Sequence, residues 1–247
     1  MCRPLLVSRF VMIDFHTHVL PEMDDGAENI SESLLMLRSC VKQGVDIVFA
    51  TSHFYADEDD PDSFLERRNK SYNKLIDAMG DDFPKYPSII PASEVLFFPG
   101  MSTAADLKKL AMGDLPCILI EPPMITWTES ILDEIEQTGI NLKLLPVVAH
   151  IDRYMRMLND YSLIDRVLQR RMLVQVNTSF FIYDKTRKKA LSLLENGKIH
   201  LIGSDCHNTT DRTPNMGEAF KIIRENIGAD KVSDIVKKSY RMVGKQI

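Results

Sequence analysis

Residues 12–18 read Met-Ile-Asp-Phe-His-Thr-His, a short apolar run that ends in two histidines separated by one residue. The run has the length and composition of a buried β-strand. The stretch Asp24-Asp25-Gly26 follows a few residues later and has the composition of a tight turn. The stretch therefore predicts a buried strand that ends in imidazole groups and is followed by carboxylate groups. The same arrangement recurs along the rest of the chain.

Six more short apolar runs follow, and amphipathic helical segments separate many of them. The predicted strands are Met12–Phe15, Asp46–Thr51, Ser88–Ser93, Cys117–Ile120, Leu144–Ala149, Met172–Val176 and Ile199–Gly203. Near-continuous runs of Ile, Val and Leu are typical of strands buried on both faces of a parallel sheet. Strands that alternate with helices predict an α/β fold, either a closed barrel or an open, doubly wound sheet.

Two of the helices carry clear boundary signals. The first has an apolar stripe at helical spacing, begins after Asn29 and ends before Gly44. In the second, Thr126 and Glu129 have the spacing of a capping box, and Gly139 is predicted to end the helix.

Side chains able to bind metal ions gather at the ends of these strands. They are His16, His18, Asp25, His53, Glu94, Glu121, His150, Asp205 and His207, and they include five of the six histidines of the chain. The sixth strand ends in Asn177. A βα barrel builds its active site at the C-terminal ends of several strands at once. This segregation therefore favours the closed barrel over the open sheet.

Imidazole nitrogen and carboxylate oxygen without thiolate suit Mn, Fe, Zn or Mg. Nine such groups exceed the roughly four to six that one ion accepts, so the sequence predicts two or three divalent ions, with Glu94 or Glu121 free to bridge. Multinuclear centres of this kind activate water for hydrolysis of phosphate esters or amides.

Two arginines favour phosphate esters. Arg153 follows His150 by three residues, and Arg212 follows His207 by five. A guanidinium fork matches a phosphate group and keeps its charge, so both are predicted to bind the substrate and serve catalysis. The alternative is that they are ordinary salt-bridge partners of the same acids. Tyr55, two residues after His53, is predicted to line the substrate pocket.

Cys206 and Arg212 also have the Cys-x5-Arg spacing of cysteine-dependent tyrosine phosphatases. That loop wraps phosphate in backbone N–H groups and lowers the pKa of its cysteine. Here the intervening residues contain no glycine, and Asp211 would repel phosphate. On an extended segment, Cys206 would also point away from Asp205 and His207. We interpret the match as accidental, and we interpret His200, at the start of the last strand, as structural.

The 247 residues are enough for one large domain, and we assign residues 12–247 to it, with residues 1–11 as an N-terminal appendage. A net charge of −5 argues against a nucleic-acid binder. The chain has no run of the ~20 apolar residues that membrane insertion needs. Residues 1–11 make a poor signal peptide, and the four cysteines lie far apart. The prediction is a cytoplasmic protein, with its oligomeric state open.

These elements together resemble the PHP (polymerase and histidinol phosphatase) superfamily, and within it the bacterial CpsB/CapC-type protein-tyrosine phosphatases of capsular and exopolysaccharide synthesis. The resemblance rests on IDFHTHVLPEMDDGA (13–27), ATSH (50–53), SEV (93–95), IEPP (120–123), AHIDRY (149–154) and GSDCHN (203–208), with Arg212. It departs where the family commonly has Pro-Glu-Arg-Tyr and this chain has Ile-Asp-Arg-Tyr (151–154).

The resemblance implies a distorted seven-stranded (β/α)7 barrel and three metal positions. One ion would be held by His16, His18, Glu94 and Asp205; a second by Glu94, Glu121 and His150; a third by Asp25, His53 and His207. Arg153 and Arg212 would correspond to the family's phosphate-binding arginines.

We therefore expect a manganese-type hydrolase that acts on a phosphotyrosine protein, such as the tail of a bacterial tyrosine kinase. Three alternatives stay open at this point. One is a small-molecule phosphomonoesterase such as a histidinol phosphatase, and another is a non-catalytic PHP-type metal-binding module. The third is a cysteine-based enzyme, which would depend on Cys206 and be indifferent to chelators.

Overall fold

A computed structural model describes residues 11–243 of the chain, apart from the side chains of residues 239, 240, 242 and 243. The appendage predicted for residues 1–11 lies outside the described residues, except for Val11. Within the described part, no helix is long and apolar enough to cross a membrane.

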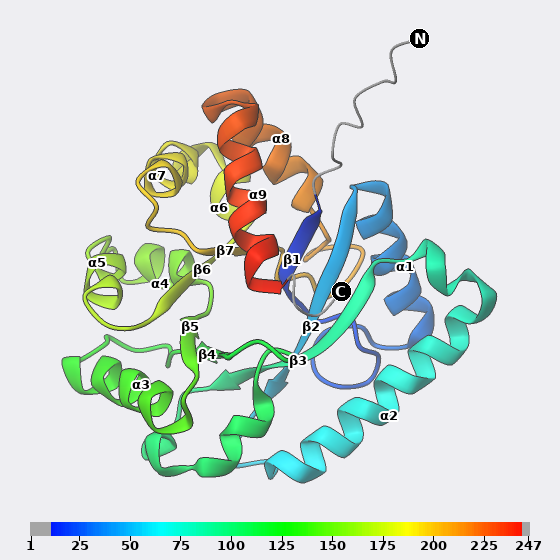
Figure 1. The fold of residues 1–247 in the computed structure, drawn as a ribbon, viewed down its shortest axis with the longest axis horizontal. Helices are drawn as coiled ribbons and strands as arrows, with labels where there is room; N and C mark the ends of the chain where they lie inside the picture. The colour runs from blue at the N-terminus through cyan, green and yellow to red at the C-terminus, as the bar shows by residue number, and fades with distance from the viewer. Residues whose placement is uncertain (1–10, 244–247) are drawn as a thin grey trace.

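Parallel strands form the centre of the molecule and follow one another in sequence order (Figure 1). They are β1 (Met12–Thr17), β2 (Val45–Phe54), β3 (Ser88–Leu96), β4 (Cys117–Glu121), β5 (Leu145–Val148), β6 (Leu173–Asn177) and β7 (Leu201–Gly203). The order β1 to β7 is that of a sheet wound in one direction, whereas a doubly wound sheet reverses its order at a switch point. The expectation of a barrel rather than an open sheet is therefore confirmed.

The first and last strands meet at their C-terminal ends. Thr17 forms a bridge with Cys206 just beyond β7. The His18 amide donates to the Cys206 carbonyl at 2.9 Å, and the Asp205 amide donates to the His16 carbonyl at 2.8 Å. This contact brings the residues after β7 beside the two histidines of β1, so the barrel closes at the rim where the predicted site residues lie.

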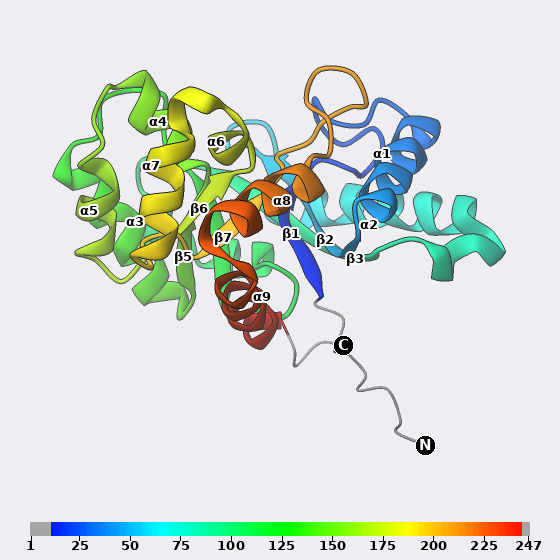
Figure 2. The same cartoon turned by 90° about the horizontal axis from the view of Figure 1, so that it is seen from above.

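Helices surround the strands (Figures 1 and 2). They are α1 (Ile30–Lys42), α2 (Pro61–Met79), α3 (Glu129–Leu142), α4 (Ile151–Met157), α5 (Leu163–Leu168), α6 (Ser179–Ile182), α7 (Asp184–Glu195), α8 (Met216–Ile227) and α9 (Ala229–Val243), with short 3₁₀ turns η1 (Gly80–Lys85), η2 (Met101–Thr103) and η3 (Ala105–Leu110). In Figure 2, α9 lies near the end where β1 begins, and the loop between β7 and α8 lies on the opposite side.

Two apolar cores hold these layers together. The smaller core comes from strands and the segment before β4, and alternate residues of one strand contribute to it, as with Ile47 and Phe49 or Cys117 and Leu119. The larger core joins the strands to the surrounding helices. Burial on both sides explains why the strands read as nearly continuous apolar runs.

Two local predictions for the boundaries of α3 were wrong. Thr126 does not cap a helix, because α3 begins at Glu129 after Thr128, and no side-chain cap is present. Gly139 does not end the helix either. It lies within α3, where a Cβ atom would approach the Pro146 ring to 2.4 Å. The glycine therefore permits close packing of α3 against β5, and the helix ends at Leu142, after which Lys143 adopts the left-handed conformation (φ 57°).

Candidate metal centre

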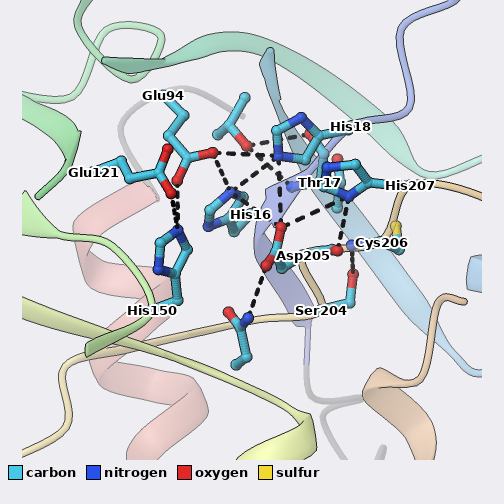
Figure 3. Close-up of polar contacts among 12 residues, drawn as sticks. His16, Thr17, His18, Glu94, Glu121, His150, Ser204, Asp205, Cys206 and His207 are labelled. Atoms are coloured by element: carbon cyan, nitrogen blue, oxygen red, sulfur yellow. Dashed lines mark hydrogen bonds and ion pairs between the residues drawn. The ribbon is translucent and has the colours of Figure 1, made fainter. Parts of the chain in front are cut away.

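All nine predicted metal-binding side chains meet at the C-terminal rim of the barrel. Figure 3 shows several of them pointing toward one another from different strands. His16, His53, Glu94 and Glu121 lie within the last residues of β1, β2, β3 and β4, because these strands run further than the sequence predicted. His150 lies two residues after the end of β5, and Asp205 and His207 lie two and four residues after the end of β7. His18 and Asp25 lie in the segment after β1.

Glu94 lies at the centre of the cluster. Its Oε2 atom is 3.0 Å from His16 Nε2, 3.4 Å from His18 Nε2 and 3.2 Å from His53 Nδ1. Its Oε1 atom is 2.9 Å from His150 Nε2. One carboxylate thus faces four imidazole rings with its two oxygens, which is the arrangement needed for a group that bridges ions.

The remaining ligand candidates extend the cluster on both sides of Glu94. Glu121 Oε1 is 3.3 Å from His150 Nε2 on one side. On the other side, Asp25 Oδ1 is 3.2 Å from His207 Nε2 and 3.5 Å from His53 Nε2. Asp205 Oδ1 lies 3.6 Å from both His16 and His18. These neighbours agree with the three groups that the family resemblance implied, and the assignment of each residue to an ion stays a prediction.

Two of the candidate ligands depend on an unusual backbone conformation. His150 has a φ of 27° and Asp205 a φ of 54°, a region that non-glycine residues rarely adopt. The Gln175 side chain accepts a hydrogen bond from the His150 amide at 2.5 Å, and the His16 carbonyl accepts one from the Asp205 amide. Backbone in sparsely populated conformations is often retained at functional sites, and here it coincides with the residues that complete the cluster.

Burial and charge act against each other within the cluster. Burial alone would raise the pKa of Glu94, but the surrounding imidazoles, His16 first, hold it well below the usual range. Burial would likewise lower the pKa of His150, yet Glu121 and Glu94 raise it to about 9. At His207, burial and the neighbouring His18 lower the pKa to about 3. Without metal ions, protonated imidazoles would therefore have to balance part of the carboxylate charge.

The donor atoms fit divalent metal ions. Three sets of imidazole nitrogens and carboxylate oxygens lie within 4.8 Å of one another: His18 with Asp25, His53 and His207; His16 with His18 and Glu94; and His53 with Glu94 and Glu121. His53 Nδ1 and His207 Nε2 are buried and have no hydrogen-bond partner. Buried polar atoms without a partner are costly. Each of these two nitrogens lies 3.2 Å from a carboxylate oxygen, a separation that two ligands of one ion can have.

The two arginines lie at the edge of the cluster and contact its carboxylates. Arg153 donates to Asp205 Oδ2 at 2.6 Å and approaches Glu121 at 3.4 Å. Arg212 donates to Asp205 Oδ1 at 2.8 Å and lies 3.5 Å from Asp25. Their side chains are 31% and 39% exposed. The ion pairs that the sequence offered as the alternative role of these arginines are therefore present, and their binding of a phosphate group stays a prediction.

Tyr55 lies beside the cluster. Its ring stacks on His53 with a centroid distance of 5.4 Å and an interplanar angle of 19°. It also lines a cavity of about 210 Å³ together with Asp25, His53 and Arg67. Its position agrees with the expected pocket-lining place, and contact with a substrate stays a prediction.

Cys206 belongs to the core rather than to the cluster. Its side chain is buried, and burial raises the pKa of the thiol well above the usual value. In Figure 3 its sulfur points away from Asp205 and the histidines. A low-pKa thiolate is what a cysteine-dependent phosphatase requires, so this geometry agrees with an accidental Cys-x5-Arg match. His200 directly precedes β7, and its Nδ1 accepts a hydrogen bond from the Val174 amide.

Several supporting residues were missed by the sequence reasoning. Asp24 accepts a hydrogen bond from His18 Nδ1 at 2.9 Å. Asn177 donates to Asp205 Oδ2 at 2.8 Å. Asp14 accepts from the amides of His16 on β1 and of Ser204, which directly follows β7. For Asp14 and Asn177 the available signal was a polar residue within or at the end of an apolar strand, which needs a partner when it is buried. Asp24 lies in a turn, where an acidic residue gives no such signal.

A closed parallel barrel with a His, Asp and Glu cluster at its C-terminal rim defines the class of metal-dependent hydrolases built on βα barrels. More specifically, the chain belongs to the family described as "Capsular polysaccharide synthesis, CpsB/CapC", whose model matches residues 12–243. The family inferred from the sequence motifs is thereby confirmed.

Relatives in this family are tyrosine-protein phosphatases by name. The tyrosine-protein phosphatase YwqE of Bacillus subtilis is 29% identical over 232 residues, which cover 89% of this chain and 86% of that protein. The tyrosine-protein phosphatase CpsB of Streptococcus pneumoniae is 28% identical over 248 residues, covering 91% and 94%. The predicted enzyme class agrees with these names.

The fold also has a solved counterpart. A structure described under YwqE from Bacillus subtilis and CpsB from Streptococcus pneumoniae, "unique metal-dependent tyrosine phosphatases", superposes with a TM-score of 0.80 at 23% identity, covering 96% of each chain. This likeness supports the barrel topology described above.

Proposed function

We propose that this protein is a metal-dependent phosphatase that hydrolyses phosphotyrosine on proteins. The observation that carries the proposal is the position of Arg153 and Arg212, two partly exposed guanidinium groups at the edge of a buried cluster of imidazoles and carboxylates. Guanidinium groups match the charge and shape of a phosphate group. The relatives named above are tyrosine-protein phosphatases.

The charge of the site supports more than one divalent ion. The carboxylates are Asp24, Asp25, Glu94, Glu121 and Asp205, and the cations are Arg153 and Arg212. With neutral imidazoles these groups carry a formal charge of minus three, so one divalent ion would leave the site negative and two would make it positive. A dianionic phosphate ester needs the positive site. Two or three ions are therefore proposed.

The nature of the ions follows from the donor atoms. Imidazole nitrogens and carboxylate oxygens, with the thiol of Cys206 directed away, suit manganese and also iron, zinc or magnesium. Manganese is the ion we favour for this set. When bound, such ions would supply Lewis-acid activation of water and of the phosphoryl oxygens.

The protein's own residues would bind and orient the ester. Arg153 and Arg212 would turn from Asp205 toward the non-bridging oxygens of the phosphate, and Tyr55 would line the approach beside His53. The leaving group is a phenol with a pKa of ~10, which needs less protonation than an alkyl alcohol. The mechanism accordingly needs no dedicated general acid among the described residues.

The substrate would be a protein that carries phosphotyrosine, such as the tail of a bacterial tyrosine kinase. The matching family is described by capsular polysaccharide synthesis, which agrees with this partner. A cytoplasmic location is part of the proposal. The free, buried state of Cys40, Cys117 and Cys206 supports it, because a reducing compartment keeps thiols unpaired.

The test is a side-by-side assay of the metal-loaded protein on a phosphotyrosine peptide, a phosphoserine peptide and histidinol phosphate. We expect kcat/KM to be highest for the phosphotyrosine peptide. A preference for histidinol phosphate would identify a small-molecule phosphomonoesterase instead. Absence of turnover on all three by protein with its full metal content would contradict the proposed function and favour a metal-binding module.

A further inference from the structure

The carboxylate of Asp24 joins the ends of two neighbouring strands. Its Oδ2 atom accepts hydrogen bonds from His18 Nδ1 and from the His53 backbone amide, each at 2.9 Å. Its Oδ1 atom accepts one from the Gly26 amide at 3.0 Å. The side chain is only 3% exposed. One buried carboxylate thus contacts the segment after β1, the end of β2 and its own turn.

The bond to Asp24 determines how His18 presents its ring. With Nδ1 donating to Asp24, the Nε2 atom is free to face Glu94 at 3.4 Å and Asp205 at 3.6 Å. A histidine that binds a metal ion commonly donates its other ring N–H to a carboxylate, which fixes the tautomer and strengthens the ligand. The geometry at His18 has this form.

Two other histidines of the cluster have weaker partners. His16 Nδ1 lies 3.4 Å from the Gln175 amide oxygen, and His207 Nδ1 lies 3.0 Å from the Asp205 carbonyl. A charged acceptor forms a stronger hydrogen bond than a neutral one. The Asp24 contact is therefore the strongest orienting contact among these three rings.

Asp24 and the adjacent Asp25 have different surroundings. Both oxygens of Asp24 already accept hydrogen bonds, and its side chain is buried. The Asp25 side chain is 63% exposed, and its Oδ1 faces His207 and His53. The Asp25 carboxylate can therefore act as a metal ligand. The Asp24 carboxylate already uses both oxygens in hydrogen bonds to His18, Gly26 and the His53 amide.

The turn that carries Asp24 can form only with glycine at position 26. A Cβ atom there would lie 2.4 Å from the His18 Cβ and 2.9 Å from Asp24 Oδ1. The Asp-Asp-Gly sequence thus folds tightly back on His18. This close approach is independent evidence that the turn is built around the contact between Asp24 and His18.

We propose that Asp24 is a positioning residue, which raises the affinity of the centre for divalent ions by holding His18 and the end of β2, without itself binding an ion. The inference rests on the proposed metal centre and extends it to the residue that orders two of its ligands. Loss of the partner of a metal-binding histidine typically costs about 10- to 100-fold in metal affinity.

The experiment measures Mn²⁺ affinity by chelator competition without substrate, for the wild-type protein, Asp24→Asn and Asp24→Ala. We expect an affinity about 100-fold lower for Asp24→Ala and about tenfold lower for Asp24→Asn, which keeps an oxygen acceptor but loses the charge. Glu28→Gln, an exposed residue of the same segment, is the matched control and should bind as the wild type does.

The thermal stability of each chelator-treated variant separates positioning from a purely structural role. A structural role predicts wild-type affinity for Asp24→Asn, because the amide oxygen in the place of Oδ2 can still accept from the His53 amide, and only the bond from the Gly26 amide is lost. That result would overturn the inference, and it would do so even if Asp24→Ala failed to fold. If the wild type binds Mn²⁺ with the expected dependence on Asp24 but hydrolyses no phosphate ester, the proposed function fails and the inference stands.

Discussion

Arg212 and Asp205 are joined by a hydrogen bond of 2.8 Å between the guanidinium Nη2 and the carboxylate Oδ1. Arg153 binds the other oxygen of the same carboxylate at 2.6 Å. Asp205 is also a candidate metal ligand, 3.6 Å from His16 and His18. A metal ion at Asp205 would compete with both arginines for its oxygens, and this competition would release guanidinium groups toward a bound phosphate.

Arg212→Ala tests the role of this arginine in binding phosphate. We expect kcat/KM for para-nitrophenyl phosphate to fall about 10²- to 10³-fold, since an oriented charged donor to the reacting group is lost. The kcat/KM of Arg212→Lys should lie between those of the wild type and of Arg212→Ala, because lysine keeps the charge but lacks the planar guanidinium group. Inhibition by inorganic phosphate should weaken in parallel, and bound metal should stay at the wild-type level. An unchanged kcat/KM in Arg212→Ala would show that Arg212 does not bind the phosphate and acts only as a salt-bridge partner of Asp205.

Removal of metal should abolish activity and lower stability. The buried Glu94 and Asp205 would lose their balancing cations, and a ligand that binds only the folded state at about 100 times its Kd contributes about 2.7 kcal/mol. For a chain of this size, that corresponds to a fall in Tm of roughly 5–10 °C for each tightly held ion. The measurement is hydrolysis and thermal unfolding before and after chelation, with Mn²⁺ added back. Metal content must be read in the same sample, and full activity in metal-free protein would contradict the metal centre.

Cys206→Ser should retain activity within about twofold of the wild type. The thiol is buried, its raised pKa keeps it protonated, and the segment to Arg212 lacks glycine. The assay is hydrolysis of para-nitrophenyl phosphate, with iodoacetamide labelling of the native wild type as a second measurement. A fall in kcat/KM of more than about 100-fold in Cys206→Ser with full metal content would support the cysteine mechanism.

His200 should make stability depend on pH away from the metal centre. Its Nδ1 accepts a hydrogen bond from the Val174 amide, so the ring must be neutral there. Burial lowers its pKa below 6.5, and Lys238 lowers it further. The unfolded chain therefore binds a proton first as the pH falls below 6.5, and the contribution of His200 to stability is lost progressively from that point downward.

His200→Asn keeps an acceptor for the Val174 amide but removes the titration. The wild type should lose more stability than this variant when urea unfolding is compared between about pH 8 and about pH 5. Identical pH profiles for the two proteins would show that His200 does not contribute in this way.

Much of the barrel and of the candidate site could be predicted from the sequence. Apolar runs such as residues 46–51, which lie within β2, identify buried strands, and parallel strands place their C-terminal ends at one rim. The residues at those ends, from His16 to His207, were therefore expected to meet, and the structure brings them together. Helix α1 followed its signals as well, with Asn29 accepting from the Glu32 amide at its N-terminus.

Local signals failed where packing overrides them. Gly139 looks like a helix end in the sequence, but its missing side chain serves the contact with Pro146. Helix α2 was not predicted, and only the structure shows its buried Arg68 donating to the Ala92 carbonyl and Ser93 on β3. Neither role can be read from neighbouring residues, because the partners are distant in the chain.

The sequence by itself determined which side chains stand at the strand ends, because period and polarity are local properties of each segment. Only the tertiary structure decided how those side chains face one another. The closure of β1 on β7, the positive φ of His150 and Asp205, and the contact of Asp24 with the His53 amide all depend on hydrogen bonds between segments that are distant in the chain. Such bonds form only when the whole barrel closes. No pattern along the sequence therefore predicts them.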